Sequence, residues 1–369
     1  MILRGLFAAP KRVGSKWDNT VEWSRRKRPA ARRWRLPILK FLLTLVLLVV
    51  VIVLVVAGAA FYVVHTPYGP SQETFVEIAP HTGTPAIAAQ LERAGVIRSR
   101  YGFELLRELL RGRLQAGEYR FDRPLPMTEV YRRIARGEIY TQALTIPEGY
   151  NIFDIAQAVQ DQGFGSRDAF LAAERQHTEL IAAWAPKDGP QPASLEGYLF
   201  PDTYYFPRKA TPLQILTAMV HRFRQVSTQL GMASDVNRTV ILASLVEKEV
   251  SQPSERPLVA GVFINRLAKG MPLATDPTVI YAALLNNRWR GTIYASDLQS
   301  PSPYNTYKHT GLPPGPICNP GTASLRAALA PAQTDYLYFV SDASGHSRFS
   351  ATLAEHAQQV QAYREAVKH

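Results

Sequence analysis

The chain has 369 residues, of which 46% are hydrophobic and 20% are charged, and its net charge at pH 7 is +12. This composition can form a core, and the length predicts two or three domains. The basic charge is concentrated in residues 1–40, which hold twelve Lys or Arg and only two acidic residues, so residues 41–369 carry +2. Such a tail could bind nucleic acid, but a membrane next to it explains the charge more simply, so we predict no nucleic-acid partner.

An uncharged apolar run of 24 residues, 41–64, follows the basic tail. A bilayer core needs roughly 20 apolar residues in a helix, and basic residues next to such a helix place that end in the cytoplasm. We therefore predict a cytoplasmic tail over 1–40, one transmembrane helix over 41–64, and the remaining chain outside the membrane. A signal peptide cleaved near residues 57–60 is the alternative, although the apolar run continues past that site.

A weak internal repeat comes next. The segments "IAAQLERAG" at 87–95 and "IAQAVQDQG" at 155–163 share a pattern of apolar residues and a final glycine, 68 residues apart. Each follows a β-like run and a turn with Pro and Gly, which predicts a strand, a tight turn and a short helix ending at glycine. This unit resembles half of a LysM module, a glycan-binding fold, and suggests a LysM-like region over 75–165. A chance match between two common units is the alternative.

Residues 166–369 form a second predicted domain. Apolar periodicity predicts helices over 239–250 and 259–270, a strand over 335–342 and a helix near the C-terminal end. Residues 300–321 are rich in Pro and Gly and are predicted to be irregular. Helices and strands alternate without a regular βαβ rhythm, so we predict an α+β fold.

Common motifs for nucleotide and metal chemistry are absent from the sequence. It has no Gly-rich phosphate loop and no G-x-S-x-G motif, and its eight His show no metal-ligand spacing. The single cysteine, Cys318, allows neither an internal disulfide nor a cysteine metal cluster. We predict no metal site and no cofactor.

Glu247 is the first candidate for chemistry. It follows an almost wholly apolar run, 240–246, as expected for a helix inside a domain. Its helical neighbours Ala243, Ser244 and Val250 are small or apolar, so a ligand could approach it and no cation lies beside it on that face of its own helix. Desolvation in such a place would favour the protonated form that a general acid needs. The alternative is an ordinary solvated helix end, and periodicity alone favours it.

Aromatic and amide residues gather in three other segments, 195–206, 275–281 and 301–321. Tyrosine rings can stack on sugars, while Asn and Asp can bond to hydroxyl and acetamido groups. Each aromatic residue taken alone is more typical of a core than of a site.

Taken together, these segments resemble one family. The chain contains, in order, "LEGYLFPDTYYF", "LASLVEKEV", "VFINRL", "DPTVIYA", "YNTYKHTGLPPGPICNPG" and "YLYFV". Over about residues 75–365 it is similar to the MltG-type (YceG-like) endolytic murein transglycosylases. The resemblance implies a bacterial inner-membrane enzyme with an external, periplasmic catalytic domain over 166–369 and a LysM-like subdomain. It also implies that Glu247, the first Glu of "VEKE", is the catalytic residue.

The implied reaction cleaves the β-1,4 bond between N-acetylmuramic acid and N-acetylglucosamine within nascent peptidoglycan strands. Glu247 would protonate the leaving oxygen and then take the proton of the muramyl C6 hydroxyl as it attacks C1, which leaves a 1,6-anhydro end. Such an enzyme would terminate strand elongation. Candidate groove residues are Glu196, Tyr198, Asn265, Asp276, Tyr304, Asn305 and Tyr307.

Two other carboxyl groups and two other functions stay open. Glu249 lies roughly 200° round the helix from Glu247 and should point away from it, while Glu255 is a spare carboxyl for a two-acid hydrolytic mechanism. A muramidase-type hydrolase and a non-catalytic peptidoglycan-binding scaffold are the alternatives. The predicted partners are peptidoglycan strands and the inner membrane, with the peptidoglycan synthesis machinery as a further candidate.

Overall fold

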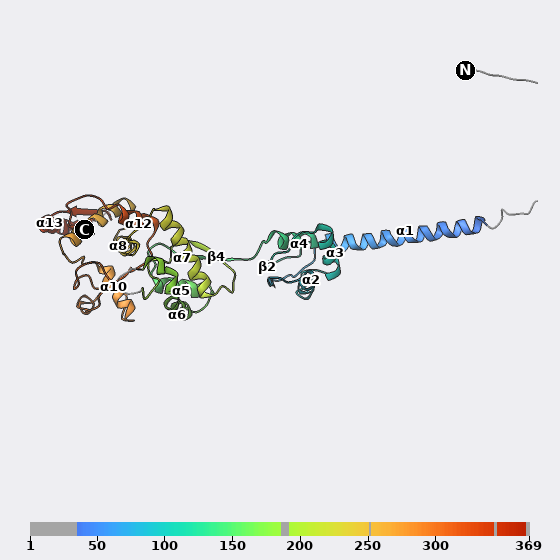
Figure 1. Ribbon diagram of the computed structural model, residues 1–369, viewed down its shortest axis with the longest axis horizontal. Helices are drawn as coiled ribbons and strands as arrows, with labels where there is room; N and C mark the ends of the chain where they lie inside the picture. Colours follow the sequence, from blue (N-terminus) through green and yellow to red (C-terminus); the bar gives the residue numbers. More distant parts are fainter. Residues whose placement is uncertain (1–34, 186–191, 251, 343–344, 367–369) are drawn as a thin grey trace, which may run out of the picture. The chain divides into compact units, whose positions relative to one another are not determined.

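A computed structural model describes residues 35–185, 192–250, 252–342 and 345–366 (Figure 1). Residues 1–34 of the predicted 1–40 tail lie outside these described residues. The chain divides into two compact units: the first comprises residues 1–74, 82–114 and 121–135, and the second comprises 75–81, 115–120 and 136–369.

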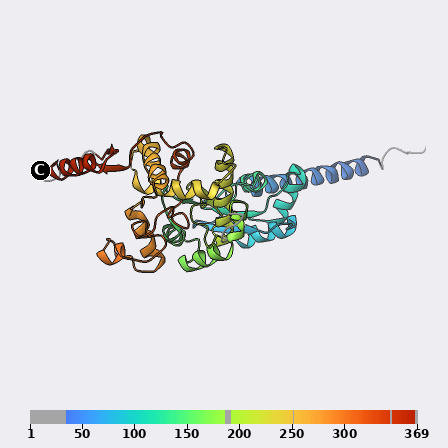
Figure 2. The same cartoon turned by 60° about the vertical axis from the view of Figure 1, so that its left-hand side comes forward.

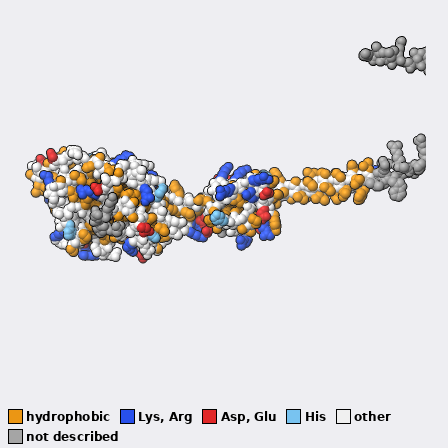
Figure 3. All heavy atoms as spheres, in the orientation of Figure 1, with side chains coloured by type: hydrophobic (Ala, Val, Ile, Leu, Met, Phe, Trp, Pro, Cys, Tyr) orange, Lys and Arg blue, Asp and Glu red, His pale blue; other side chains and the backbone are white. Residues whose placement is uncertain are grey.

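The first helix, α1 (Arg35–His65), contains the predicted apolar run. Its segment Leu39–His65 has 27 residues and a mean hydropathy of 3.3, and none of it is buried against protein. At about 1.5 Å per residue it is longer than the roughly 30 Å hydrocarbon core of a bilayer. Figure 3 shows its surface as continuously hydrophobic. Within the described residues it is the one helix long and apolar enough to cross a membrane.

Three more helices complete the first unit: α2 (Thr84–Arg93), α3 (Arg100–Leu110) and α4 (Met127–Arg136). The α3 helix is capped by Ser99, whose hydroxyl accepts a hydrogen bond from the Gly102 backbone at 3.3 Å. Rings of α3 and α4 then meet, because Phe103 and Tyr131 lie 5.9 Å apart between their ring centroids.

The order strand–helix–helix–strand occurs twice in the chain. The first copy is β1 (Thr74–Ile78), α2, α3 and β2 (Gly117–Phe121). The second begins with β3 (Gln142–Thr145), α5 (Ile152–Asp161) and α6 (Arg167–Gln176), and after a 3₁₀ turn it ends with β4 (Thr203–Phe206).

The repeat segments fall on α2 and α5, which confirms the predicted strand, turn and short helix. Gly95 and Gly163 follow these helices with φ of +68° and +77°, a left-handed conformation that glycine adopts without steric cost. The β3 strand pairs with β4 in antiparallel register, with Leu144 opposite Tyr204.

Helix α8 (Val236–Glu249) runs through the core of the second unit, and every residue from Val240 to Val246 is buried. It packs against α12 (Thr322–Leu329), α9 (Arg256–Ala268) and α10 (Asp276–Leu285). Figure 1 shows α8 beside α12. A helix buried on all sides explains why its apolar run has no amphipathic period.

The neighbours of this core complete the second unit. Helix α7 (Pro212–Gln229) packs on α6, and α11 (Ala295–Leu298) precedes the predicted irregular segment, which has no helix or strand before α12. A hairpin of β5 (Tyr338–Ser341) and β6 (Ser347–Ser350) leads into α13 (Leu353–Ala366), red in Figure 2. The fold is therefore mixed α/β, with its described strands in two-stranded sheets.

The core around α7 gives a stability prediction. Phe223 is fully buried, with its ring 4.9 Å from that of Trp184 and 5.1 Å from that of Tyr198. Phe223→Ala should lower the free energy of unfolding by about 3–5 kcal/mol because it leaves a cavity. Leu213→Ala, on the same helix but 39% exposed, should change it by only about 0.5 kcal/mol. Urea unfolding of the detergent-solubilised chain measures both, and equal losses would contradict this core assignment.

Candidate active site

The carboxylate of Glu247 is enclosed and held at both oxygens. It lies in the last turn of α8, and its side chain is 6% exposed. Its Oε1 accepts a bond from Arg256 Nη2 at 3.0 Å, and its Oε2 accepts one from the Gly321 backbone N–H at 3.0 Å. Arg256, the first residue of α9, is itself only 10% exposed. Because the pair is nearly dry, each bond is stronger than it would be in water.

These contacts correct the sequence-based account of the surroundings of Glu247. A cation does reach it, from the next helix rather than from its own. The side of α8 that carries Ala243 and Ser244 is not open to a ligand either. The Ser244 hydroxyl accepts a bond from the Ile317 backbone at 3.1 Å, and Ala243 is fully buried. That face of α8 is therefore covered by the segment leading to Gly321.

A second carboxyl, Glu148, reaches the same arginine. It lies in the turn between β3 and α5, where Tyr150 N–H contacts Pro147 O at 3.5 Å and Gly149 has φ of +79°. Glu148 Oε2 is 4.0 Å from Arg256 Nη2, and this side chain is 50% exposed. Burial, and then the charge of Glu247, raise the pKa of Glu148, while Arg256 opposes the shift.

Asn319 positions this turn beside the helix. Its side chain is fully buried, and its Nδ2 donates to Glu196 Oε1 at 2.8 Å and to Tyr150 O at 3.0 Å. Its Oδ1 accepts the Leu199 N–H at 2.8 Å, and its backbone O accepts the Gly149 N–H at 3.0 Å. One buried amide thus joins the 148–150 turn, the 195–199 segment and the segment that carries Gly321.

Glu196 belongs to this buried network. It is 2% exposed, and its Oε2 accepts the N–H of Ile152, the first residue of α5, at 3.0 Å. Burial raises its pKa to about 8, although bonds from Ile152 and Tyr281 oppose the shift. The structure thus places this predicted groove residue in the interior, where it joins the helix start to Asn319.

Three more of the predicted groove residues bond within the protein. Tyr198 is buried, and its hydroxyl donates to Asn237 Oδ1 at 3.0 Å. Asn305 is buried and donates to the carbonyls of Leu298 and Ser300. Asn265, half-buried on α9, donates to the Thr334 carbonyl at 2.7 Å.

The remaining three predicted groove residues are accessible at the surface. The exposed side chains of Asp276 and Tyr307 are joined by a 2.8 Å hydrogen bond in which the Tyr307 hydroxyl donates. Tyr304 is half-buried, with its ring 5.1 Å from that of Tyr281. A bound molecule could touch these three, whereas Glu196, Tyr198 and Asn305 are buried.

Tyr304 also lines a cavity of about 590 Å³, within the usual range for ligand sites. Its wall combines aromatic and charged side chains from α5, α6, α10 and their loops: Ile152, Phe153, Arg167, Asp168, Leu171, Glu174, Arg175, Ala193, Ser194, Tyr281, Leu285, Asn287 and Tyr304.

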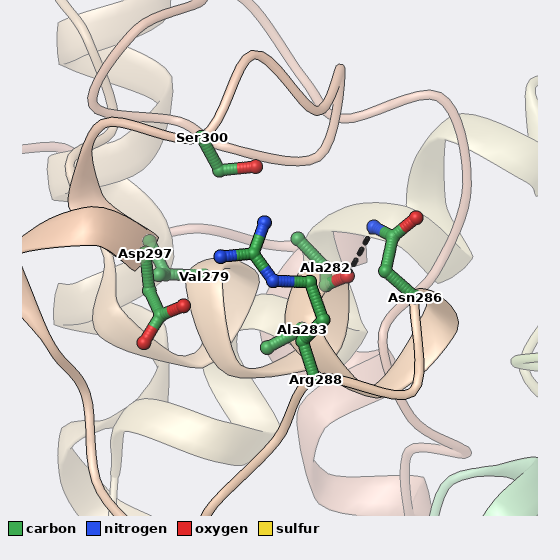
Figure 4. Close-up of a pocket in the computed structure, with 7 residues that line it drawn as sticks. All are labelled: Val279, Ala282, Ala283, Asn286, Arg288, Asp297 and Ser300. Atoms are coloured by element: carbon green, nitrogen blue, oxygen red, sulfur yellow. Dashed lines mark hydrogen bonds between the residues drawn. The ribbon is translucent and has the colours of Figure 1, made fainter.

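A smaller pocket between α10 and α11 is different. Figure 4 shows the Arg288 guanidinium pointing toward Asp297 and Ser300, while Asn286 donates to the Ala282 carbonyl at 2.7 Å. Its volume is about 10 Å³, enough for about one water molecule. It cannot hold a sugar.

Glu249 and Glu255 lie in other surroundings. Burial and the charge of Asp276 raise the pKa of Glu249 to about 7, although the nearby Thr275 side chain opposes the shift. Glu255 contacts His346 Nδ1 at 3.1 Å and accepts the Ser347 N–H at 3.0 Å. Burial raises the pKa of Glu255, but these bonds outweigh it and lower the pKa overall.

The sequence-based list of site residues lacked Glu148, Arg256, Asn319 and Gly321. The one signal that could have suggested Glu148 is its "PEG" turn, which follows a β-like run and presents a carboxyl beside a glycine. Within the part of the chain that the structure describes, no group of three His, Cys, Asp or Glu could hold a metal ion.

In this site, an irregular glycine-rich segment covers a carboxylate at the end of a buried helix. Residues 76–362 match the model of the YceG-like family. The match covers most of the chain, and the chain therefore belongs to the YceG-like family. This confirms the resemblance seen in the sequence.

Two named relatives and one solved structure are similar to this chain and support the family assignment. The chain is 34% identical to an endolytic murein transglycosylase of Bacillus subtilis (strain 168), covering 78% of this chain and 84% of that protein. It is 32% identical to one of Streptococcus pneumoniae serotype 2, covering 72% of this chain and 54% of that protein, so it spans about half of that relative. The crystal structure of a yceG-like protein from Listeria monocytogenes has a TM-score of 0.51 at 32% identity, covering 78% of this chain and 99% of that one.

The buried carboxyl group of Glu196 predicts how the stability of the chain depends on pH. The folded chain keeps a proton on Glu196 up to a pKa of about 8, whereas the ordinary value is 4.5. The higher pKa in the folded chain stabilises it relative to the unfolded chain. This stabilisation is complete below about pH 4.5 and is lost as pH rises through 8. Glu196→Gln should therefore flatten the fall in stability between pH 5 and pH 8.

Urea unfolding at four pH values in this range measures the slope. Glu249, whose pKa is about 7, contributes with the same sign, so the slope should shrink in the variant rather than vanish. An unchanged slope in Glu196→Gln would show that Glu196 does not titrate in this way.

Proposed function

We propose that this chain is a membrane-anchored endolytic murein transglycosylase. The observation that carries the proposal is the enclosed Glu247 carboxylate, bonded by Arg256 and the Gly321 N–H in a chain of the YceG-like family. Relatives at 32–34% identity that bear this enzyme name support the same activity. The substrate would be the β-1,4 bond between N-acetylmuramic acid and N-acetylglucosamine within nascent glycan strands.

Glu247 provides the acid–base chemistry in this proposal. As the bond between C1 and the leaving oxygen breaks, that oxygen takes a proton. The C6 hydroxyl of the same muramyl residue attacks C1 and gives its proton to the protein. No water is consumed, and the intramolecular nucleophile supplies a high effective concentration. The product ends in 1,6-anhydro-N-acetylmuramic acid, and such a cut in a growing strand would end its elongation.

Substrate contacts would come from the accessible candidates. Tyr304 offers a half-buried ring at the 590 Å³ cavity, and Asp276 and Tyr307 offer polar groups at the surface. Tyrosine suits this role because its ring can cover a sugar face while its hydroxyl bonds to water or substrate. Glu196, Tyr198, Asn265 and Asn305 would instead position the loops around the site.

The helix α1 would anchor the enzyme in the bacterial inner membrane. Its 27-residue segment Leu39–His65, with a mean hydropathy of 3.3, suits a single span, and the basic residues before it favour a cytoplasmic N-terminus. The larger unit would then lie in the periplasm, where strands emerge. The two strand–helix–helix–strand segments support a LysM-like glycan-binding role, and the synthesis machinery is a possible partner at the same membrane.

Glu247→Gln should lower the rate of strand cleavage by about 10²–10⁴-fold, because Gln cannot exchange a proton. Glu249→Gln is the matched control, since it lies on the same helix and faces Thr275. It should keep activity within a few-fold of wild type. The measurement is the initial rate of release of soluble fragments from purified peptidoglycan. Wild-type rates in the Glu247→Gln protein would reject Glu247 as the catalytic residue.

The mass of the new ends distinguishes the alternatives. Digestion of purified glycan strands should give muramyl ends that are one water lighter than reducing ends. Reducing ends would identify a muramidase-type hydrolase, and strand binding without any cleavage by wild type would identify a scaffold. Mass spectrometry of the released muropeptides makes the measurement.

Topology has its own test. A protease added outside spheroplasts should digest the unit that contains Glu247 and leave the segment before α1 protected. Protection of the larger unit would contradict a periplasmic active site. Immunoblotting with tags at the two termini reports both fragments.

A further inference from the structure

Two carboxyl groups, rather than one, contact Arg256 at this site. Arg256 Nη2 contacts Glu247 Oε1 at 3.0 Å and Glu148 Oε2 at 4.0 Å. The two oxygens are therefore no further apart than the sum of these distances. Paired catalytic carboxyl groups acting on glycosidic bonds lie about 5–9.5 Å apart, so both can address one bond.

The two carboxyl groups have unequal partners. Glu247 is 6% exposed, and each of its oxygens accepts a 3.0 Å bond, one from Arg256 Nη2 and one from the Gly321 N–H. Glu148 is 50% exposed, and its contact with Arg256 is longer. Burial and the charge of Glu247 raise the pKa of Glu148, so Glu148 holds a proton more readily than a free glutamate does.

Gly321 keeps the second carboxyl in place. A Cβ added at Gly321 would fall on the carboxyl group of Glu148, so the absence of a side chain there lets Glu148 approach. The Gly321 N–H donates to Glu247 at the same time. One residue thus fits between the two carboxyl groups and contacts both.

We propose that Glu148 is a second catalytic residue, the proton donor to the leaving oxygen, and that Glu247 is the base that accepts the proton of the C6 hydroxyl. This division of roles rests on the proposed transglycosylase function and deepens it. The two acid–base tasks that the sequence assigned to Glu247 alone are divided between a solvent-facing acid and an enclosed carboxylate.

The step balances without a co-reactant. The Glu148 proton moves to the glycosidic oxygen as the C1–O bond breaks, and the bonding pair stays on that oxygen. The C6 oxygen forms a new bond to C1, and its proton moves to Glu247. After product release, Glu247 loses this proton and Glu148 regains one from solvent, which its exposure allows.

A substrate whose leaving group needs no proton distinguishes the acid role of Glu148 from the base role of Glu247. The full chain in detergent is assayed on glycan strands and on a glycan tetrasaccharide whose terminal muramyl C1 carries 2,4-dinitrophenolate. Glu148→Gln should lose about 10²–10⁴-fold on strands but stay within about tenfold of wild type on the activated substrate. Glu247→Gln should lose activity on both, because the C6 hydroxyl still needs a base.

A second variant guards against an effect of the substitution on folding. Gly321→Ala keeps both carboxyl groups and the backbone N–H but displaces Glu148, so it should show the same selective loss on strands. Thermal unfolding of each variant checks that the fold is intact.

Several outcomes would overturn the assignment. Wild-type rates for Glu148→Gln on strands would show that Glu247 carries both roles. Equal losses on both substrates would show that Glu148 has a structural role instead. A wild-type chain that cleaves neither substrate, or one that leaves reducing ends, would instead reject the proposed function itself, and the two failures are thereby distinguished.

Discussion

The side-chain amide of Asn319 is the interaction on which the geometry of this site depends. It is fully buried and bonds to Glu196, Tyr150 and Leu199. A buried amide left without partners costs about 1–3 kcal/mol for each unmade bond, so the three segments that satisfy it are held in one arrangement. Gly321, two residues later, is thereby placed where its N–H reaches Glu247.

Arg256 joins the two carboxyl groups of this site. It is 10% exposed and lies between Glu247, which accepts a bond at each oxygen, and the solvent-exposed Glu148. In such a place a guanidinium acts more strongly than it would at the surface. Arg256 contacts both carboxyl groups before any substrate arrives, and the exposed side chain of Glu148 can exchange protons with water. In the proposed function, this arrangement is preorganised for moving a proton.

Local patterns predicted the elements well, because each depends on nearby residues. The apolar run gave α1, the repeated glycines gave the ends of α2 and α5, and the apolar run before Glu247 gave the buried helix α8. Family motifs then pointed to Glu247. The segment "LEGYLF" looked like a groove because it is rich in aromatic residues, yet Glu196 and Tyr198 are interior residues. Composition cannot distinguish an aromatic core from an aromatic groove.

The partners of Glu247 could not be predicted in this way. Arg256 belongs to the next helix, and Gly321 is 74 residues away in the chain. Glu148 is nearly a hundred residues before Glu247 and meets it only because Asn319 bonds to the turn at Gly149 and Tyr150. Such contacts follow from tertiary packing, and no periodicity in the sequence encodes them.

The central claim is that the muramyl C6 hydroxyl, rather than water, attacks the bond held at Glu247. Digestion of glycan strands in water enriched in ¹⁸O tests it most directly, because hydrolysis must place one solvent oxygen on each new muramyl end. The account predicts new ends without ¹⁸O, whatever the length of the fragments. One ¹⁸O atom at each new end would contradict it and identify a hydrolase.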